Sequence, residues 1–131
     1  MIRAAGVIVI VMLSCSTSRV VETKTGLKYT VIKKGKGKEA NVGNEVLLHE
    51  KMSYRNDSLL FSSYSLPQPV KALIGGKQVI DGVDEGLRGM KKGEIRKLIV
   101  PPALSKRNGP QSFPHPDSIL IYEVELIDIL N

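Results

Sequence analysis

The two histidines are the side chains of this chain best suited to acid–base chemistry or to metal binding. Neither His49 nor His115 has a second ligand at the short spacing typical of a metal site. His49 falls within an alternating pattern, where we expect a packed or edge strand residue. The chain has no Gly-x-Ser-x-Gly segment of a serine hydrolase, and the pair Gly35-x-Gly37 lacks the third glycine of a dinucleotide-binding loop. We therefore expect no metal, no cofactor, and no catalytic acid, base or nucleophile.

Cys15 follows a segment typical of an export signal. Arg3 supplies a positive charge, and residues 4–13 form an apolar run that is shorter than the roughly 20 residues needed to span a bilayer. Residues 12–15, Met-Leu-Ser-Cys, resemble the lipobox of bacterial lipoproteins, with Met12 where the family usually has Leu. The resemblance implies a signal peptide at residues 1–14, a lipid on Cys15 and a place in the cell envelope, periplasmic or at the outer membrane. The alternative is an ordinary cleaved signal followed by a chance cysteine.

Loss of the signal would leave 117 of the 131 residues, a length that suits one domain. Cys15 is the only cysteine, so that domain has no internal disulfide. Six lysines crowd its start, at positions 24, 28, 33, 34, 36 and 38. They could contact anionic head groups, but Glu22 and Glu39 dilute the run and we expect a solvated strand and turn. Nucleic acid is not an expected partner of an exported chain without interleaved stacking rings, and we expect a monomer.

The hydrophobic pattern predicts the elements that position these residues. Residues 16–24 have little to bury and are expected to form a tether. Alternation or short apolar runs predict strands at residues 27–32, 45–54, 58–62, 70–74, 94–100 and 118–130. The polar residues 35–38 are expected to end the first strand, and residues 55–57 to form a turn. Five prolines predict a long stiff loop at residues 101–117.

One helix is predicted between residues 79 and 90. Its apolar stripe consists of Val79, Val83, Leu87 and Met90, and acidic residues occupy its early turns, where the helix dipole favours them. Gly82, Gly86 and Gly89 each weaken a helix by about 1 kcal/mol relative to alanine. Three glycines so close together predict that the helix backbone approaches a sheet face. The expected fold class is therefore α+β, an antiparallel sheet with one short helix against it.

The order of these elements carries a resemblance to a known family. The segments concerned are residues 25–29, 35–37, 43–46 with His49, 60–64, 75–82, 85–87, 90–94 and 122–126. Together they resemble an FKBP-type peptidyl-prolyl cis-trans isomerase domain, here residues 25–131. The resemblance implies a strongly curved antiparallel β-sheet wrapped around one short α-helix, with a substrate pocket between them.

The chemistry that the resemblance implies is rotation about an X-Pro bond. Rotation sacrifices amide resonance against a barrier of about 18 to 20 kcal/mol. A dry pocket that holds the proline ring stabilises the less polar twisted amide without a nucleophile or a general base. The implied partners are proline-containing segments of exported polypeptides.

The resemblance also assigns the substrate-binding pocket, residue by residue. Its expected members are Leu60, Phe61, Val70, Val79, Ile80, Val83, Phe113 and Tyr122. Ile80 would offer its backbone N–H to the substrate carbonyl, and Tyr122 keeps the aromatic position of the last strand.

The remaining pocket positions depart from the family pattern. Glu50 replaces a Tyr, Leu60 a Phe and Phe61 an Asp; Val70 and Val83 stand where the family has rings or a large apolar group. In the loop, residues 105–107 replace an Ala-Tyr-Gly segment. The divergent pocket leaves three hypotheses: an isomerase of reduced activity that assists the folding of exported proteins, a non-catalytic binding or chaperone module, and a domain with a structural role in the envelope.

Overall fold

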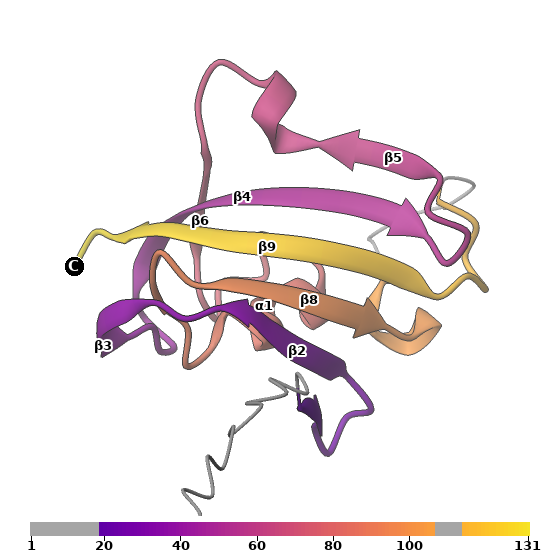
Figure 1. Ribbon diagram of the computed structural model, residues 1–131, viewed down its shortest axis with the longest axis horizontal. Helices are drawn as coiled ribbons and strands as arrows, with labels where there is room; N and C mark the ends of the chain where they lie inside the picture. Colours follow the sequence, from indigo (N-terminus) through magenta and orange to yellow (C-terminus); the bar gives the residue numbers. More distant parts are fainter. Residues whose placement is uncertain (1–18, 107–113) are drawn as a thin grey trace, which may run out of the picture.

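The computed structural model describes residues 19–106 and 114–131, and its main feature is a seven-stranded antiparallel sheet (Figure 1). The strand order is β1 (Val20–Glu22), β2 (Lys28–Lys33), β8 (Ile95–Val100), β9 (Leu120–Ile129), β4 (Glu45–Tyr54) and β5 (Leu59–Ser62). β6 (Val70–Leu73) pairs with the other half of the same edge of β4. β3 (Lys36–Glu39) and β7 (Lys91–Lys92) form a separate two-stranded sheet. Short 3₁₀ turns, η1 (Ser63–Ser65) and η2 (Pro102–Leu104), follow β5 and β8.

The core lies between this sheet and the helix α1 (Asp81–Leu87), which packs against one face of the sheet (Figure 1). β4 and β9 are the longest strands, and over most of their length every second residue is buried, so that one face of each is buried. The inward row of β9 is Leu120, Tyr122, Val124 and Leu126, each at most 2% exposed. The predicted α+β architecture, a curved antiparallel sheet around one short helix, is confirmed.

The predicted close approach of the helix to the sheet is confirmed at two glycines. A Cβ on Gly82 would lie 2.6 Å from Val100 Cγ1, and one on Gly86 would lie 2.5 Å from Leu98 Cδ1. These distances are far below van der Waals contact, so only glycine allows α1 to lie this close to β8. Gly89 differs, because it has φ +82° just after the helix and serves the turn instead.

The helix is shorter than the predicted span of residues 79–90. Ile80 and Arg88 have extended backbones on either side of it, with ψ 153° and 130°. Beyond its end, Arg96 donates hydrogen bonds to the Gly86 and Arg88 carbonyls at 3.3 and 3.0 Å. The same guanidinium pairs with the buried Glu94 carboxylate. Arg96 therefore satisfies carbonyls at the helix end, where a continued helix would otherwise do so.

Three short strands differ from the sequence expectations. Val20–Glu22 forms β1, paired with β2, so the expectation of a tether over residues 16–24 is wrong for these three residues. The stretch expected to end the first strand contributes to β3, which pairs with β7 just after the helix. All residues of β1 and β3 are exposed, so these strands pair through backbone hydrogen bonds. Their sequences therefore contain no hydrophobic alternation from which a strand could be predicted. The last strand begins at Leu120 rather than at residue 118.

Candidate functional site

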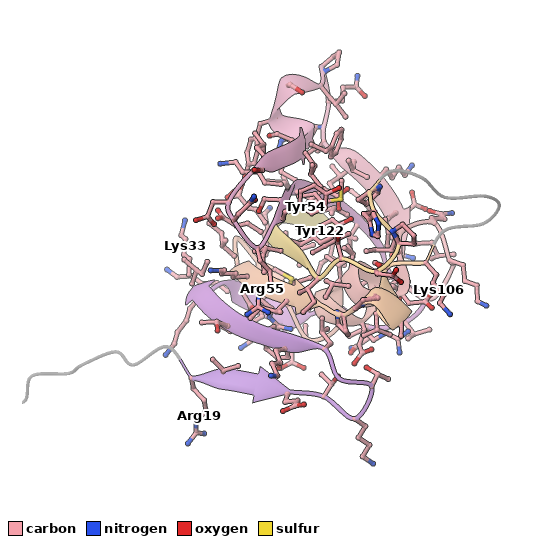
Figure 2. All side chains as sticks on the ribbon, turned by 90° about the vertical axis from the view of Figure 1, so that its right-hand side faces the viewer. Arg19, Lys33, Tyr54, Arg55, Lys106 and Tyr122 are labelled. Atoms are coloured by element: carbon pink, nitrogen blue, oxygen red, sulfur yellow. The ribbon has the colours of Figure 1, made fainter. Side chains whose placement is uncertain are left out.

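A cavity of about 490 Å³ lies between the start of α1 and the inner sides of β4, β6 and β9. Its apolar lining is Val70, Val79, Ile80, Val83 and Tyr122. Val83 and Tyr122 are only 1% and 2% exposed, so they form the floor. In Figure 2, Tyr122 lies toward the centre of the molecule and Lys106, another lining residue, lies at its margin.

The structure thus brings together five of the eight residues predicted to bind substrate. Leu60 packs partly buried against the core, and Phe61 is 36% exposed opposite Met52; neither lines this cavity. Their strand β5 pairs with the far half of β4, whereas the cavity lies beside β6. Phe113 and Cys15 lie outside the described residues.

Ile80 places a backbone donor at the cavity. It is the residue before α1, and its carbonyl accepts hydrogen bonds from the N–H groups of Val83 and Asp84, both at 3.0 Å. Within residues 19–106 and 114–131, its own N–H donates no hydrogen bond. An N–H that no protein acceptor satisfies is suited to a ligand carbonyl.

Two side-chain acceptors hold the loop that carries Val79 and Ile80. Asp84, on α1 and 5% exposed, accepts a hydrogen bond from Gly75 N–H at 2.8 Å. Gln78 Oε1 accepts one from Leu73 N–H at 2.9 Å. Arg88 donates to the other oxygen of Asp84 at 2.9 Å, which fixes that carboxylate. The loop is therefore fastened at both ends before any ligand arrives.

Tyr122 is held from the neighbouring strand. It lies opposite Met52 in the β4–β9 ladder, and its hydroxyl donates to Met52 Sδ at 3.0 Å. Tyr122 lies on the same buried face of β9 as Val124 and Leu126, so its ring is directed toward the helix. A single aromatic ring therefore remains in the described floor of the cavity.

Five polar residues line the cavity beside the predicted substrate-binding residues: Glu50, Lys77, Gln78, Asp81 and Lys106. The resemblance already gave Glu50 and residues 105–107 as altered pocket positions, whereas Lys77, Gln78 and Asp81 were not named for the pocket. The parity of β4 agrees for Glu50, because Val46, Leu48 and Met52 are buried at spacings of two and four from it. Lys77 and Lys106 are exposed on loops, where no periodic signal exists.

The backbone of Glu50 is paired with Val124 of β9 on one edge of β4, and it is fixed by a side chain on the other edge, where no strand lies beside it. The pairing with β6 ends at Leu48 and that with β5 begins at Lys51. Ser63, fully buried in η1, fills this gap: its hydroxyl accepts Glu50 N–H at 2.7 Å and lies 2.9 Å from His49 Nδ1.

His49 belongs to the opposite, outer side of β4, as an edge or packed residue. Its ring stacks on Tyr64 with 4.2 Å between centroids. The Tyr64 hydroxyl donates to Glu125 Oε1 at 3.2 Å, and burial together with this carboxylate raises the pKa of Tyr64 to about 12.

Among the described residues there is no cluster of three His, Asp or Glu side chains fit to hold a metal, and no helix with the length and apolarity to cross a membrane.

Known proteins resemble the chain in sequence and in fold. The family model described as "FKBP-type peptidyl-prolyl cis-trans isomerase" matches residues 36–127. The chain is 39% identical over 111 residues to the FKBP-type peptidyl-prolyl cis-trans isomerase FkpA of Buchnera aphidicola, a match that covers 84% of this chain and 43% of the relative. It is 38% identical over 103 residues to FK506-binding protein 1 of Dictyostelium discoideum, with coverage of 78% and 96%.

The fold similarity agrees with the sequence similarity. The crystal structure of FkpA from Escherichia coli superposes with a TM-score of 0.73 at 34% identity, covering 84% of this chain and 51% of that one. The chain thus spans less than half of the Buchnera relative and about half of the E. coli chain, but nearly all of the Dictyostelium protein.

Proposed function

The chain belongs to the FKBP-type peptidyl-prolyl cis-trans isomerase family, and on this premise we propose that its cavity binds X-Pro segments and isomerises them at a reduced rate. The observation that carries the proposal is that a buried floor lies beside a backbone donor without a protein acceptor among the described residues. Val83 and Tyr122 form the floor of the cavity. The Ile80 N–H donates no hydrogen bond to any described residue, so it can bind a substrate carbonyl.

The expected mechanism needs no group that titrates. The proline ring occupies the apolar floor, and the Ile80 N–H binds the carbonyl next to the rotating bond. As the amide twists it loses resonance and becomes less polar, so a dry surface favours it over the planar ground state. The substrate segment is held in one orientation while the bond turns.

Replacement of Ile80 tests this donor directly. Ile80→Pro removes the N–H, and the observed φ of −60° suits proline, so the helix start should survive. Ile80→Val keeps the N–H and trims the side chain, which makes it the matched control. We expect Ile80→Pro to lower kcat/KM for a proline peptide about tenfold, as expected for one charge-free hydrogen bond, and Ile80→Val to change it far less. Equal activity in both variants would contradict the assignment.

The reduced rate is inferred from the lining. Aromatic side chains bury about 150 to 250 Å² each, and the described cavity keeps one ring, whereas Glu50 lines a wall. A carboxylate beside the proline retains water near the rotating bond. Glu50→Tyr should therefore raise kcat/KM, while Lys97→Tyr, on the exposed side of β8, should leave it unchanged. No gain from Glu50→Tyr would argue against the reduced-rate proposal.

A second candidate, a binding or chaperone module without turnover, is favoured by the charges around the cavity. Glu50, Lys77, Asp81 and Lys106 all line it. Such a rim suits retention of a polar polypeptide segment as well as entry of a proline. The two functions separate when a peptide shifts the Ile80 amide resonance but its cis–trans exchange is not accelerated.

The proposed setting is the cell envelope. Lipid on Cys15 would hold the domain where exported, proline-containing chains pass and fold. Mass spectrometry of the mature N-terminus tests this, because a diacylglyceryl or acyl mass on Cys15 is expected. An unmodified terminus at another residue would contradict the anchor.

A further inference from the structure

The β1–β2 end of the sheet gathers basic and apolar side chains that no residue in 19–106 or 114–131 covers. We call this end the basic edge and define it by Arg19, Lys24, Lys28, Lys33 and Lys34 with Val20, Val21 and Ile32. All eight are exposed, Val20 by 57% and Ile32 by 53%. The isomerase pocket does not use any of them.

The charge of the basic edge is not neutralised by ion pairs within the described part of the fold. From Arg19 to Lys34 the sequence holds five cations and one carboxylate, Glu22. None of these cations takes part in the ion pairs between described residues, which join other side chains. The edge therefore presents a positive potential to solvent.

The apolar residues share the surface with the charges. Val20 lies opposite Thr30 in the β1–β2 ladder, and Ile32 is exposed at the irregularity in β2 between Val31 and Lys33. Lys28 precedes Thr30 by two and so lies on the same face as Thr30. Exposed aliphatic groups among lysines are the residue types by which amphipathic surfaces bind the head-group region of a membrane.

The basic edge is also the part of the domain that follows the export segment directly in the sequence. Cys15 precedes Arg19 by four residues, so an extended chain separates them by at most about 14 Å. Because this is an upper limit, an anchor at Cys15 would let the edge approach a bilayer to within one Debye length, about 8 Å at physiological salt. Cations at that distance are attracted to anionic lipids.

We propose that the basic edge docks on an anionic lipid bilayer and turns the cavity toward passing polypeptides. Figure 2 shows Arg19 and Lys33 on one side of the molecule and the cavity residue Lys106 on the other. Docking through the edge therefore leaves the cavity open. The sequence pattern favours a strand and turn that only contact water. The exposed Val20, Val21 and Ile32 side chains favour docking instead, because they can be buried in a membrane surface.

The test separates docking from the anchor and from isomerase activity by using residues 19–131. The Dictyostelium relative matches over 96% of its length, so a chain of this extent forms a complete domain in the family. Partition is measured by co-sedimentation with phosphatidylcholine vesicles, with and without about one third phosphatidylglycerol. We expect binding only to the anionic vesicles, and a decrease as salt is raised.

Paired variants locate the surface. Lys33→Gln with Lys34→Gln should lower partition about 25-fold, from about fivefold for each charge. The control, Lys51→Gln with Lys71→Gln, changes net charge equally at exposed lysines of β4 and β6, away from the edge and the cavity, and should have little effect. Ile32→Ser should weaken the binding that remains at high salt.

Three outcomes would overturn the proposal. They are equal partition to neutral and anionic vesicles, equal losses in the two lysine pairs, and a concentration-dependent dimer that Ile32→Ser disrupts. The last would assign the edge to a second copy of the chain. Isomerase activity of the same variants is measured in parallel. Failure of the isomerase proposal can then be distinguished from failure of the docking proposal.

Discussion

Gly86→Ala should destabilise the domain although alanine favours helices. A Cβ at this position would lie 2.5 and 2.8 Å from the two Cδ atoms of Leu98 and 3.2 Å from its Cγ. Leu98 is fully buried in β8, where the surrounding core is close-packed. The Leu98 side chain, the helix or the strand must therefore shift.

The size of the effect follows from two opposing terms. Alanine gains about 1 kcal/mol over glycine in a helix, whereas overpacking a tight core costs about 1 to 3 kcal/mol. Because three Leu98 atoms lie inside contact distance, we take the upper end of that range. The free energy of unfolding should fall by about 2 kcal/mol.

Urea unfolding of residues 19–131 measures this change, and a double-mutant cycle checks its cause. Leu98→Ala alone should cost about 2 to 5 kcal/mol, since it leaves a cavity. In the double variant, Leu98→Ala removes the clash with the Cβ introduced by Gly86→Ala, and this Cβ fills part of the cavity. The double variant should therefore lose at least about 1 kcal/mol less unfolding free energy than the sum of the two single losses. A neutral Gly86→Ala, or strict additivity in the cycle, would refute the proposed packing of α1 on β8.

Three further perturbations have definite expected outcomes. Arg96→Met should cost about 3 to 5 kcal/mol in urea unfolding, because it leaves Glu94 charged and buried; adding Glu94→Gln should recover part of the loss. The Tyr64 phenol should titrate by absorbance near pH 12, and Glu125→Gln should lower that midpoint toward 10. Unfolded Tyr64 ionises first, so its contribution to stability should be lost between about pH 10 and 12. Ser63→Ala should cost about 1 to 3 kcal/mol, since a buried backbone N–H then loses its acceptor.

Hydrophobic alternation predicts the parts of this fold that bury one face. The inward rows of β4 and β9 are buried at every second position, apart from the half-buried Glu50 and Tyr54 at the cavity side and the strand end. β1 and β3 pair through the backbone while all their side chains remain exposed, so their sequences carry no such signal. The helix ends were misplaced because Val79 and Met90 continue the apolar stripe into the core without being helical.

The candidate site divides in the same way. Val79, Ile80 and Val83 could be placed from motif and helix period together, because the helix must pack on the sheet whether or not a ligand binds. The charged lining could not be predicted from pattern alone, since Lys77 and Lys106 reach the cavity from loops. Phe61 shows the opposite limit: its position in the motif indicated the pocket, yet it is 36% exposed on β5 and does not line the cavity.

The most direct test of the proposed isomerase is the cis–trans exchange rate of a short X-Pro peptide, measured by NMR exchange spectroscopy with residues 19–131. We predict exchange faster than the uncatalysed rate, which takes tens of seconds or longer, but slower than with an FKBP family member that has a full set of pocket aromatic residues. The Ile80 amide resonance should shift as peptide is added. Exchange at the uncatalysed rate with no shift at Ile80 would contradict both the isomerase and the binding function.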